Sequence, residues 1–279
     1  GFNTMAQSLQ ATYTELQENN RQLETALGKI QLLERAKEEL GRFVPSAVKQ
    51  LIDEGADSLD GQGEERDVSV LFLDIAGYTQ MSEALDQRMV NYLVERYFSA
   101  YLDDIYANGG DINETAGDGL MIIFQGDDGH GHAEAAVRTA VAIARKTEDV
   151  NQSLGENGYP VRVHIGINSG PASVGLRRFR GLAGERWTYT AAGPTTNVAA
   201  RIATMAGEGD ILIGEETASR VNDVVGLQPL GDFSLKNVAE PVAVYRVVWR
   251  EEDGFPHGPY SVRSVSDARV DRATMESLR

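Results

Sequence analysis

The 279-residue sequence contains no cysteine and only four histidines. Without cysteine the chain can form no disulfide and can use no thiolate as a nucleophile or a metal ligand. The few histidines form no cluster with the spacing of a metal site. A disulfide-stabilised fold and thiol-based catalysis are therefore excluded.

Basic residues are also scarce, because 26 Lys and Arg stand against 42 Asp and Glu and give a net charge of −16. A general nucleic-acid-binding protein needs a basic face, so we expect no nucleic acid partner. No apolar run reaches the length of a transmembrane helix, and no signal peptide is visible. The first residue is Gly1 rather than Met. We therefore expect a fragment of a longer chain, and a membrane segment upstream stays possible.

A heptad repeat occupies residues 1–42. One apolar series runs every seven positions from Phe2 to Ile30, and a second, offset by three, runs from Met5 to Leu40. This is the pattern of a coiled coil, and a helix with so narrow an apolar stripe is unstable alone. Three polar residues lie in the seam and would fix its register: Thr12, Asn19 and Lys37. We predict a parallel coiled coil of two copies.

Three further parts follow the predicted coiled coil. Pro45 interrupts the heptads, and residues 43–66 contain a short predicted helix and an acidic, Gly-rich linker. Residues 67–249 carry the strand and helix patterns of a globular domain. Residues 250–279 are polar, with few large apolar side chains, and we expect a flexible tail.

The globular domain alternates between strand and helix patterns. Its core order is strand, helix, strand, strand, helix, strand, which predicts an α+β, ferredoxin-like βαββαβ fold with additional strands. The core strands are predicted at residues 68–73, 112–115, 120–124 and 161–169. Helices are predicted at residues 93–105, 133–150, 195–206 and 215–221. A return strand at residues 172–175 is predicted to pair with the last core strand across Gly170 and Pro171.

Two aspartates lie where predicted strands end. Asp74 ends the apolar run VSVLFLD, and Asp118 lies in a tight Gly-Asp-Gly turn between the next two strands. Carboxylates on adjacent strand ends suit hard divalent cations held against a triphosphate. Single loop aspartates commonly just stabilise turns. The two together predict a metal site.

Four stretches occur in order along the globular domain: LFLDIAGYT, NETAGDGLMIIF, VHIGINSGPASVG and YTAAGPTTNVAARI. Together they resemble the catalytic domain of class III nucleotidyl cyclases, the adenylate and guanylate cyclases, over about residues 43–248. The initial GFNTMAQSL resembles the end of a HAMP signalling module. These resemblances imply a cytoplasmic domain of a membrane-bound receptor, joined by its coiled coil to an upstream receptor segment.

The cyclase resemblance assigns roles to several residues. It implies that Asp74, Asp118 and the backbone carbonyl of Ile75 hold two divalent cations, Mg or Mn. Asn197 would position the ribose and Arg201 would stabilise charge on the α-phosphate, and their spacing of four places them on one helix face. In this family the metal pair and the Asn/Arg pair come from different subunits. The resemblance therefore implies a head-to-tail homodimer with shared active sites.

The identity of the nucleotide depends on two predicted base contacts, Glu114 and Thr190. The commonest adenylate cyclase pattern has a lysine at the position of Glu114. Guanine offers donors at N1 and its amino group, which suit an ionised glutamate, whereas a threonine hydroxyl can serve guanine or adenine. We lean to GTP, with ATP as the alternative. Lys236 is a further candidate that could reach the triphosphate from another loop.

Other functional classes stay open. A cyclase-like domain could bind nucleotide or protein without turnover, and Glu114 would then mark a mismatched base pocket. A diguanylate cyclase or polymerase-type palm shares the core topology, but AGDGLM stands where a GG(D/E)EF-like hairpin is expected. A purely structural coiled-coil adaptor would explain the heptads and none of the later motifs.

Overall fold

The computed structural model describes residues 1–41, 44–53, 63–126, 128–154, 158–181 and 184–250. Contacts divide the chain into two units, Gly1–Gly55 and Ala56–Arg279. The predicted tail, apart from its first residue, and most of the predicted acidic linker lie outside the described residues.

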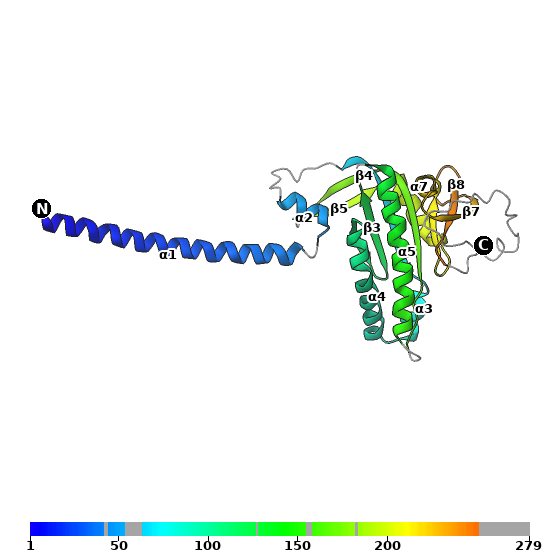
Figure 1. Cartoon of the computed structure of the whole chain (residues 1–279), viewed down its shortest axis with the longest axis horizontal. Coiled ribbons are helices and arrows are strands. Elements are labelled where there is room, and N and C mark those ends of the chain that lie inside the picture. Colours follow the sequence, from blue (N-terminus) through cyan, green and yellow to red (C-terminus); the bar gives the residue numbers. More distant parts are fainter. Residues whose placement is uncertain (42–43, 54–62, 127, 155–157, 182–183, 251–279) are drawn as a thin grey trace. The chain divides into compact units, whose positions relative to one another are not determined.

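The first unit consists of α1 (Phe2–Gly41) and α2 (Ser46–Asp53), and α1 is a single uninterrupted helix (Figure 1). Its heptad residues are exposed in one chain: Phe2 is 88% exposed, Leu9 74% and Leu23 67%. Burial of such a stripe against a second copy is what stabilises a coiled coil. Within the described residues, no helix is both long enough and apolar enough to cross a membrane.

Lys37, predicted to lie in the coiled-coil seam, forms an ion pair with Asp53 of α2 in the same chain. Both side chains are half exposed. Exposed ion pairs of this kind contribute little to stability, about 0–1 kcal/mol. The Lys37–Asp53 pair therefore adds little to the stability of the first unit.

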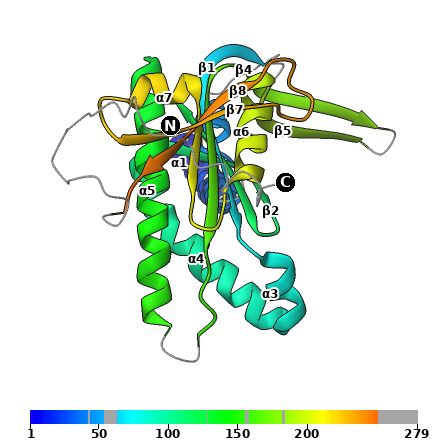
Figure 2. The same cartoon turned by 90° about the vertical axis from the view of Figure 1, so that its right-hand side faces the viewer.

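The second unit is built on a mixed sheet with the order β2-β3-β1-β4-β6-β8-β7, and β5 pairs with β4 outside this path (Figure 2). The strands are β1 (Glu64–Ile75), β2 (Gly110–Ala116), β3 (Gly119–Gln125), β4 (Val163–Gly181), β5 (Gly184–Ala192), β6 (Ile211–Gly214), β7 (Gly226–Phe233) and β8 (Val242–Val248). The order β2-β3-β1-β4, all antiparallel, is that of a ferredoxin-like sheet. The predicted α+β fold is confirmed.

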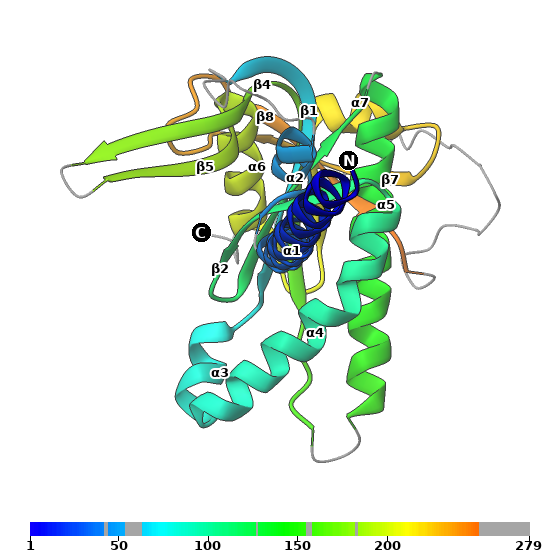
Figure 3. The ribbon, with the colours of Figure 1, turned by 90° about the vertical axis from the view of Figure 1, so that its left-hand side faces the viewer.

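The helices of this unit are α3 (Tyr78–Ala84), α4 (Gln87–Ala107), α5 (Gly129–Ser153), α6 (Pro194–Met205) and α7 (Glu215–Val221). Helices α4 and α5 run alongside each other and, with α7, pack on one face of the sheet (Figure 3). Leu71 and Leu73 of β1 point into that layer. Val68 and Val70 point to the opposite face, where α6 packs. This second face is called the α6 face below.

The structure corrects the expected hairpin at Gly170 and Pro171, because β4 continues through both residues as one strand. On one side this part of β4 pairs with β1. On the other side the pairing with β6 ends at Ile167, and the pairing with β5 begins at Ser173. Proline is tolerated where a strand has no neighbour that needs its N–H. Pro171 lies in such a gap, so it does not end the strand.

Candidate active site

The two predicted metal aspartates lie at one end of β1. Asp74 aligns with Gly119 of β3, directly after the turn that carries Asp118. The Ile75 N–H donates to the Asp118 carbonyl at 3.2 Å and ties that turn to β1. Antiparallel pairing thus brings together two carboxylates that are distant in the sequence.

The electrostatics of the pair fit a cation site. Burial, a hydrogen bond to Asp74 and repulsion from its charge together raise the pKa of Asp118 to about 6. Two adjacent carboxyls disfavour each other's ionised form, and a bound cation removes that penalty. Carboxylate and carbonyl oxygens are the ligands that Mg²⁺ prefers. The residues present therefore fit a hard divalent cation.

The cation ligands from the chain are few. Among the described residues, no group of three or more His, Asp or Glu side chains is arranged to hold a metal ion. Magnesium commonly binds through one or two carboxylates and takes its other ligands from water and substrate phosphates. A site with Asp74, Asp118 and the Ile75 carbonyl is of that open kind.

His164 is a neighbour of the pair that the sequence interpretation did not single out. It aligns with Asp74 across the β1–β4 ladder. Burial lowers its pKa, against opposing effects of the Ala206 backbone and Asp118. Its Nδ1 is buried and has no hydrogen-bond partner in the described part of the chain. The alternating pattern of VHIGIN could have placed His164 on the face shared with Asp74.

Asn197 and Arg201 lie together on α6, as their spacing predicts. Val198 and Ile202 are buried on the sheet side of this helix, whereas Asn197 is exposed and Arg201 is half-buried. Within the described residues, neither polar side chain has a hydrogen-bond or ion-pair partner. The helix therefore presents an amide and a guanidinium group on the side turned away from its own sheet.

One chain does not bring Asn197 to the carboxylate pair. The Thr195 hydroxyl, two residues earlier, donates to the Pro171 carbonyl at 2.7 Å. Pro171 aligns with Asp67, seven residues before Asp74 on β1. Seven residues of strand span about 23 Å. The start of α6 thus lies at the other end of β1 from Asp74.

Glu114 lies on the same face as Asp74. It aligns with Met121, which in turn aligns with Phe72 of β1. Phe72 and Met121 both pack on the α6 face. Since side chains two residues apart on a strand share a face, Asp74 belongs to this face as well. Glu114 is exposed, and it has no partner within the described residues.

Thr190 lies on β5, half-buried, and its hydroxyl donates weakly to the Ala191 carbonyl at 3.3 Å. Lys236 lies in the connection between β7 and β8, before Asn237, whose φ is 63°. Strand β8 is three strands from β1, on the order of 14 Å. Lys236 is exposed and, among the described residues, has no ion-pair partner. The connection that carries Lys236 therefore leads into a strand that is not adjacent to β1.

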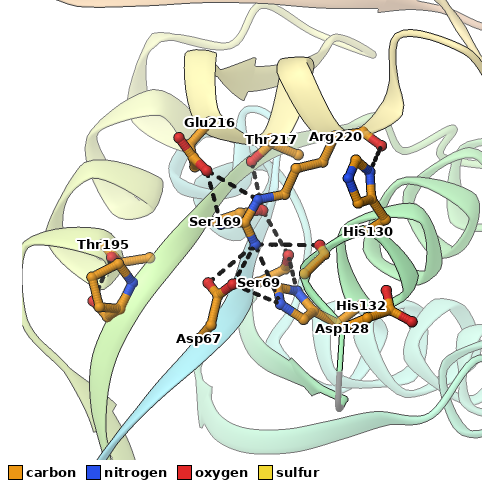
Figure 4. A network of polar contacts seen from close by, with 12 residues as sticks. Asp67, Ser69, Asp128, His130, His132, Ser169, Thr195, Glu216, Thr217 and Arg220 are labelled. Carbon is orange, nitrogen blue, oxygen red and sulfur yellow. Dashed lines mark hydrogen bonds and ion pairs between the residues drawn. The ribbon is translucent and has the colours of Figure 1, made fainter.

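A second polar cluster lies at the other end of β1 (Figure 4). It is called the Ser69 network and consists of Asp67, Ser69, His132, Ser169, Thr217 and Arg220. Ser69 Oγ lies 2.8 Å from His132 Nδ1 and 2.6 Å from Ser169 Oγ, which lies 2.9 Å from the Thr217 hydroxyl. Arg220 Nη1 donates to both carboxylate oxygens of Asp67, at 2.9 and 3.0 Å.

The Ser69 network superficially suggests a hydrolytic triad, because His132 Nε2 also lies 3.7 Å from the Asp67 carboxylate. A nucleophilic serine must reach its substrate. Ser69 is 0% exposed. Burial lowers the pKa of His132, which favours a neutral ring. The network therefore ties β1, α5, β4 and α7 together and is not a catalytic centre.

Comparison with known proteins agrees with this geometry. The family model described as "Adenylate and Guanylate cyclase catalytic domain" matches residues 62–248. Adenylate cyclase 1 of Rhizobium meliloti is 28% identical over 223 residues, which cover 77% of this chain and 33% of the relative. The adenylate cyclase of Anabaena cylindrica is 28% identical over 206 residues, 72% of this chain and 39% of the relative. The chain thus spans a third or slightly more of the length of these curated relatives.

Solved structures of both cyclase types are similar to this chain. The adenylyl cyclase CyaB from P. aeruginosa is 28% identical with a TM-score of 0.63, covering 69% of this chain and 99% of that chain. The guanylyl cyclase Cya2 is 28% identical with a TM-score of 0.59, covering 67% of this chain and 94% of that chain. The resemblance inferred from the four motifs is confirmed, whereas the HAMP segment stays a prediction. Because the family model matches well over half of its residues, the chain belongs to the adenylate and guanylate cyclase catalytic domain family, the class III nucleotidyl cyclases.

Proposed function

We propose that the chain is a homodimeric purine nucleotidyl cyclase, which converts a nucleoside triphosphate to its 3′,5′-cyclic monophosphate and pyrophosphate. The observation that supports this most is the carboxylate pair of Asp74 and Asp118, in which burial, a hydrogen bond to Asp74 and repulsion from its charge raise the pKa of Asp118 to about 6. Such a pair gains stability from a divalent cation and its phosphate ligands.

The reaction balances without any further reactant. The ribose O3′ forms a bond to the α-phosphorus, the bond from that phosphorus to the oxygen bridging to the β-phosphate breaks, and pyrophosphate leaves. The hydroxyl proton passes to water. Asp74, Asp118 and the Ile75 carbonyl would hold two divalent cations, Mg or Mn, which when bound would supply Lewis acidity for this proton loss and for the phosphate charge.

The other polar residues orient the substrate and stabilise its charge. The Asn197 amide orients the ribose, so that O3′ faces the α-phosphate in line with the leaving oxygen. The Arg201 guanidinium stabilises the negative charge that develops there. Lys236 pairs with the triphosphate oxygens. All three side chains lack a partner within the described part of one chain, as residues that receive a ligand should.

A head-to-tail homodimer completes each site. Asn197 and Arg201 face away from the sheet that carries Asp74, and the start of α6 lies at the other end of β1. A second copy can supply its own α6 surface to the first chain's carboxylates, and the reverse contact then forms a second site. The exposed heptads of α1 favour a parallel coiled coil that holds the two copies at high local concentration.

We propose GTP as the preferred substrate. Glu114 lies on the same sheet face as Asp74, and no lysine or arginine of the described residues pairs with it. An ionised carboxylate accepts from guanine N1–H and the amino group, and the Thr190 hydroxyl can donate to guanine O6.

ATP is the alternative substrate, since Thr190 can equally accept from the adenine amino group. Both curated relatives named above are adenylate cyclases, which also favours ATP.

The test is production of cyclic GMP and cyclic AMP from the dimeric protein with Mg²⁺ or Mn²⁺. We expect cyclic GMP to dominate, and Glu114→Lys to shift the preference towards ATP. A clear ATP preference that Glu114→Lys leaves unchanged would overturn the guanine assignment. Failure to form either product, even with Mn²⁺, would contradict the proposed activity and favour a nucleotide-binding domain without turnover.

A further inference from the structure

Strand β2 contains an irregularity next to Glu114. Ile112 aligns with Ile122 of β3, but Glu114, two residues on, aligns with Met121, only one residue away. Asn113 is therefore the extra residue of a β-bulge. Bulges redirect side chains, because one additional residue reverses the alternation of faces.

The bulge determines which face Glu114 occupies. Ile112 packs in the layer of α4 and α5. Regular alternation from Ile112 would place Glu114 on that same covered face. Because of the extra residue, Glu114 lies beside Met121 on the α6 face. The bulge thus lets β2 contribute an apolar side chain to the core and a carboxylate to the face of Asp74.

The side chain of Asn113 also links β2 to β5. Its amide nitrogen donates a hydrogen bond to the backbone carbonyl of Tyr189. The Tyr189 ring packs on the α6 face, and its hydroxyl accepts from Gln125 Nε2 at 3.2 Å. In the sheet ladder β5 pairs with β4, so the contact with Asn113 joins β5 to the far edge of the sheet.

We propose that Asn113 is a positioning residue for purine recognition. Its hydrogen bond joins the residue directly before Glu114 to the residue directly before Thr190. Two contacts can read one base edge only if their separation is fixed, and Asn113 fixes it. This inference rests on the proposed function, which assigns the base contacts to Glu114 and Thr190.

Loss of the hydrogen bond should change selectivity more than turnover. A displacement of about 1 Å between groups that must act together can lower the reaction rate by up to 10²-fold. Loss of one hydrogen bond typically lowers a binding constant by about tenfold or less. We expect Asn113→Ala to raise KM for the preferred nucleotide about tenfold and to reduce the ratio of kcat/KM between GTP and ATP by a similar factor. We expect kcat to change less than threefold or so, since the carboxylate pair is untouched.

The matched control is Tyr189→Phe, which removes the bond to Gln125 but keeps the carbonyl that Asn113 binds. Its ratio of kcat/KM between GTP and ATP should stay within about twofold of the wild-type ratio. Asn113→Leu keeps approximately the shape of the side chain and removes the donor without adding a charge next to Glu114, so it should behave like Asn113→Ala. This isosteric variant also keeps the test available if the alanine variant folds poorly, as judged by its melting temperature.

The outcomes are distinct. A ratio that changes in both Asn113 variants but not in Tyr189→Phe supports the proposal. Equal reductions of kcat/KM for GTP and ATP would show a merely structural role of Asn113 and overturn the proposal. An unchanged ratio in both Asn113 variants would also overturn it. If the wild type turns over neither nucleotide, the proposed function fails first. The same comparison is then made on the Kd values for GTP and ATP, where an unchanged ratio overturns the proposal.

Discussion

The two ends of β1 carry polar clusters of opposite character. At the start of the strand, the Ser69 network is hydrogen-bonded within the chain, and Ser69 itself is fully buried. At the end of the strand, Asp74 is exposed and shares its site with a carboxyl whose charged form is disfavoured. Buried polar groups stabilise a fold when every member has a partner. Polar groups left without partners indicate where a ligand or a second copy binds.

Two arginines show the same contrast. Arg220 has a side chain 13% exposed and binds Asp67 and Glu216. Arg201 is half-buried on α6 and, among the described residues, has no ion-pair partner. An ion pair already formed within the fold contributes to stability, whereas an unpaired cation on the surface is available for phosphate. The two arginines should therefore respond to substitution in different ways.

The largest expected effect is on activity. Under the proposed function, Arg201→Ala should lower kcat about 10²–10³-fold, because it removes the charge proposed to stabilise the α-phosphate during transfer. The melting temperature should stay close to that of the wild type, since the side chain has no partner to lose. A steady-state cyclase assay and a thermal melt check both parts. Activity reduced less than tenfold or so would remove Arg201 from the catalytic site.

A smaller effect, on stability, is expected from Arg220→Ala. The change removes the ion pairs with the half-exposed Asp67 and Glu216 and the hydrogen bond to the Gly129 carbonyl, which together should cost about 1–2 kcal/mol of the free energy of unfolding. For a domain of this size the melting temperature should fall by a few degrees. Activity per folded molecule should be kept, and urea unfolding together with a cyclase assay measures both. A loss of activity without a loss of stability would place Arg220 in the catalytic machinery instead.

The smallest effect is the dependence of stability on pH, and it should have opposite signs in the two clusters. In cation-free protein the folded pKa of Asp118, about 6, lies above its ordinary 3.8. The stability that Asp118 contributes is therefore complete below 3.8 and is lost as the pH rises through 6. His132 has a folded pKa below its ordinary 6.5, so its contribution is present above 6.5 and is lost as the pH falls.

Urea unfolding across this pH range distinguishes the two groups. Asp118→Asn should abolish the loss of stability that occurs as the pH rises through about 6. Added Mg²⁺ should reverse that loss in the wild type. His132→Gln should abolish the loss on the acid side. Identical pH profiles for the wild type and both variants would show that neither group titrates as the structure indicates.

The sequence was sufficient for the fold and the carboxylate pair. Asp74 and Asp118 follow apolar strand patterns, and antiparallel pairing of neighbouring strands then brings strand ends together. Helix α6 was likewise predicted closely, because Pro194 and Gly207 mark its two ends. Local periodicity and strong turn signals were thus enough to predict much of the architecture.

Other features depend on partners that no local pattern shows. Gly170 and Pro171 indicate a turn, yet β4 continues through them. On the side away from β1, no strand among the described residues pairs with β4 between Ile167 and Ser173, so no partner needs the missing N–H of Pro171. The Ser69 network draws residues from four separate elements. The bulge at Asn113 is visible only through the alignment of β2 with β3. Each is set by tertiary contacts rather than by propensity.

The central claim, that each active site is completed by a second copy, is tested most directly by complementation. Asp118→Asn and Arg201→Ala, each expected to retain about 1% of wild-type activity or less alone, are co-expressed so that mixed dimers form. In a mixed dimer one site carries both changes and the other carries neither, so random pairing should restore about a quarter of wild-type activity. Activity no greater than that of the separate variants, in dimers shown to be mixed, would contradict a shared site.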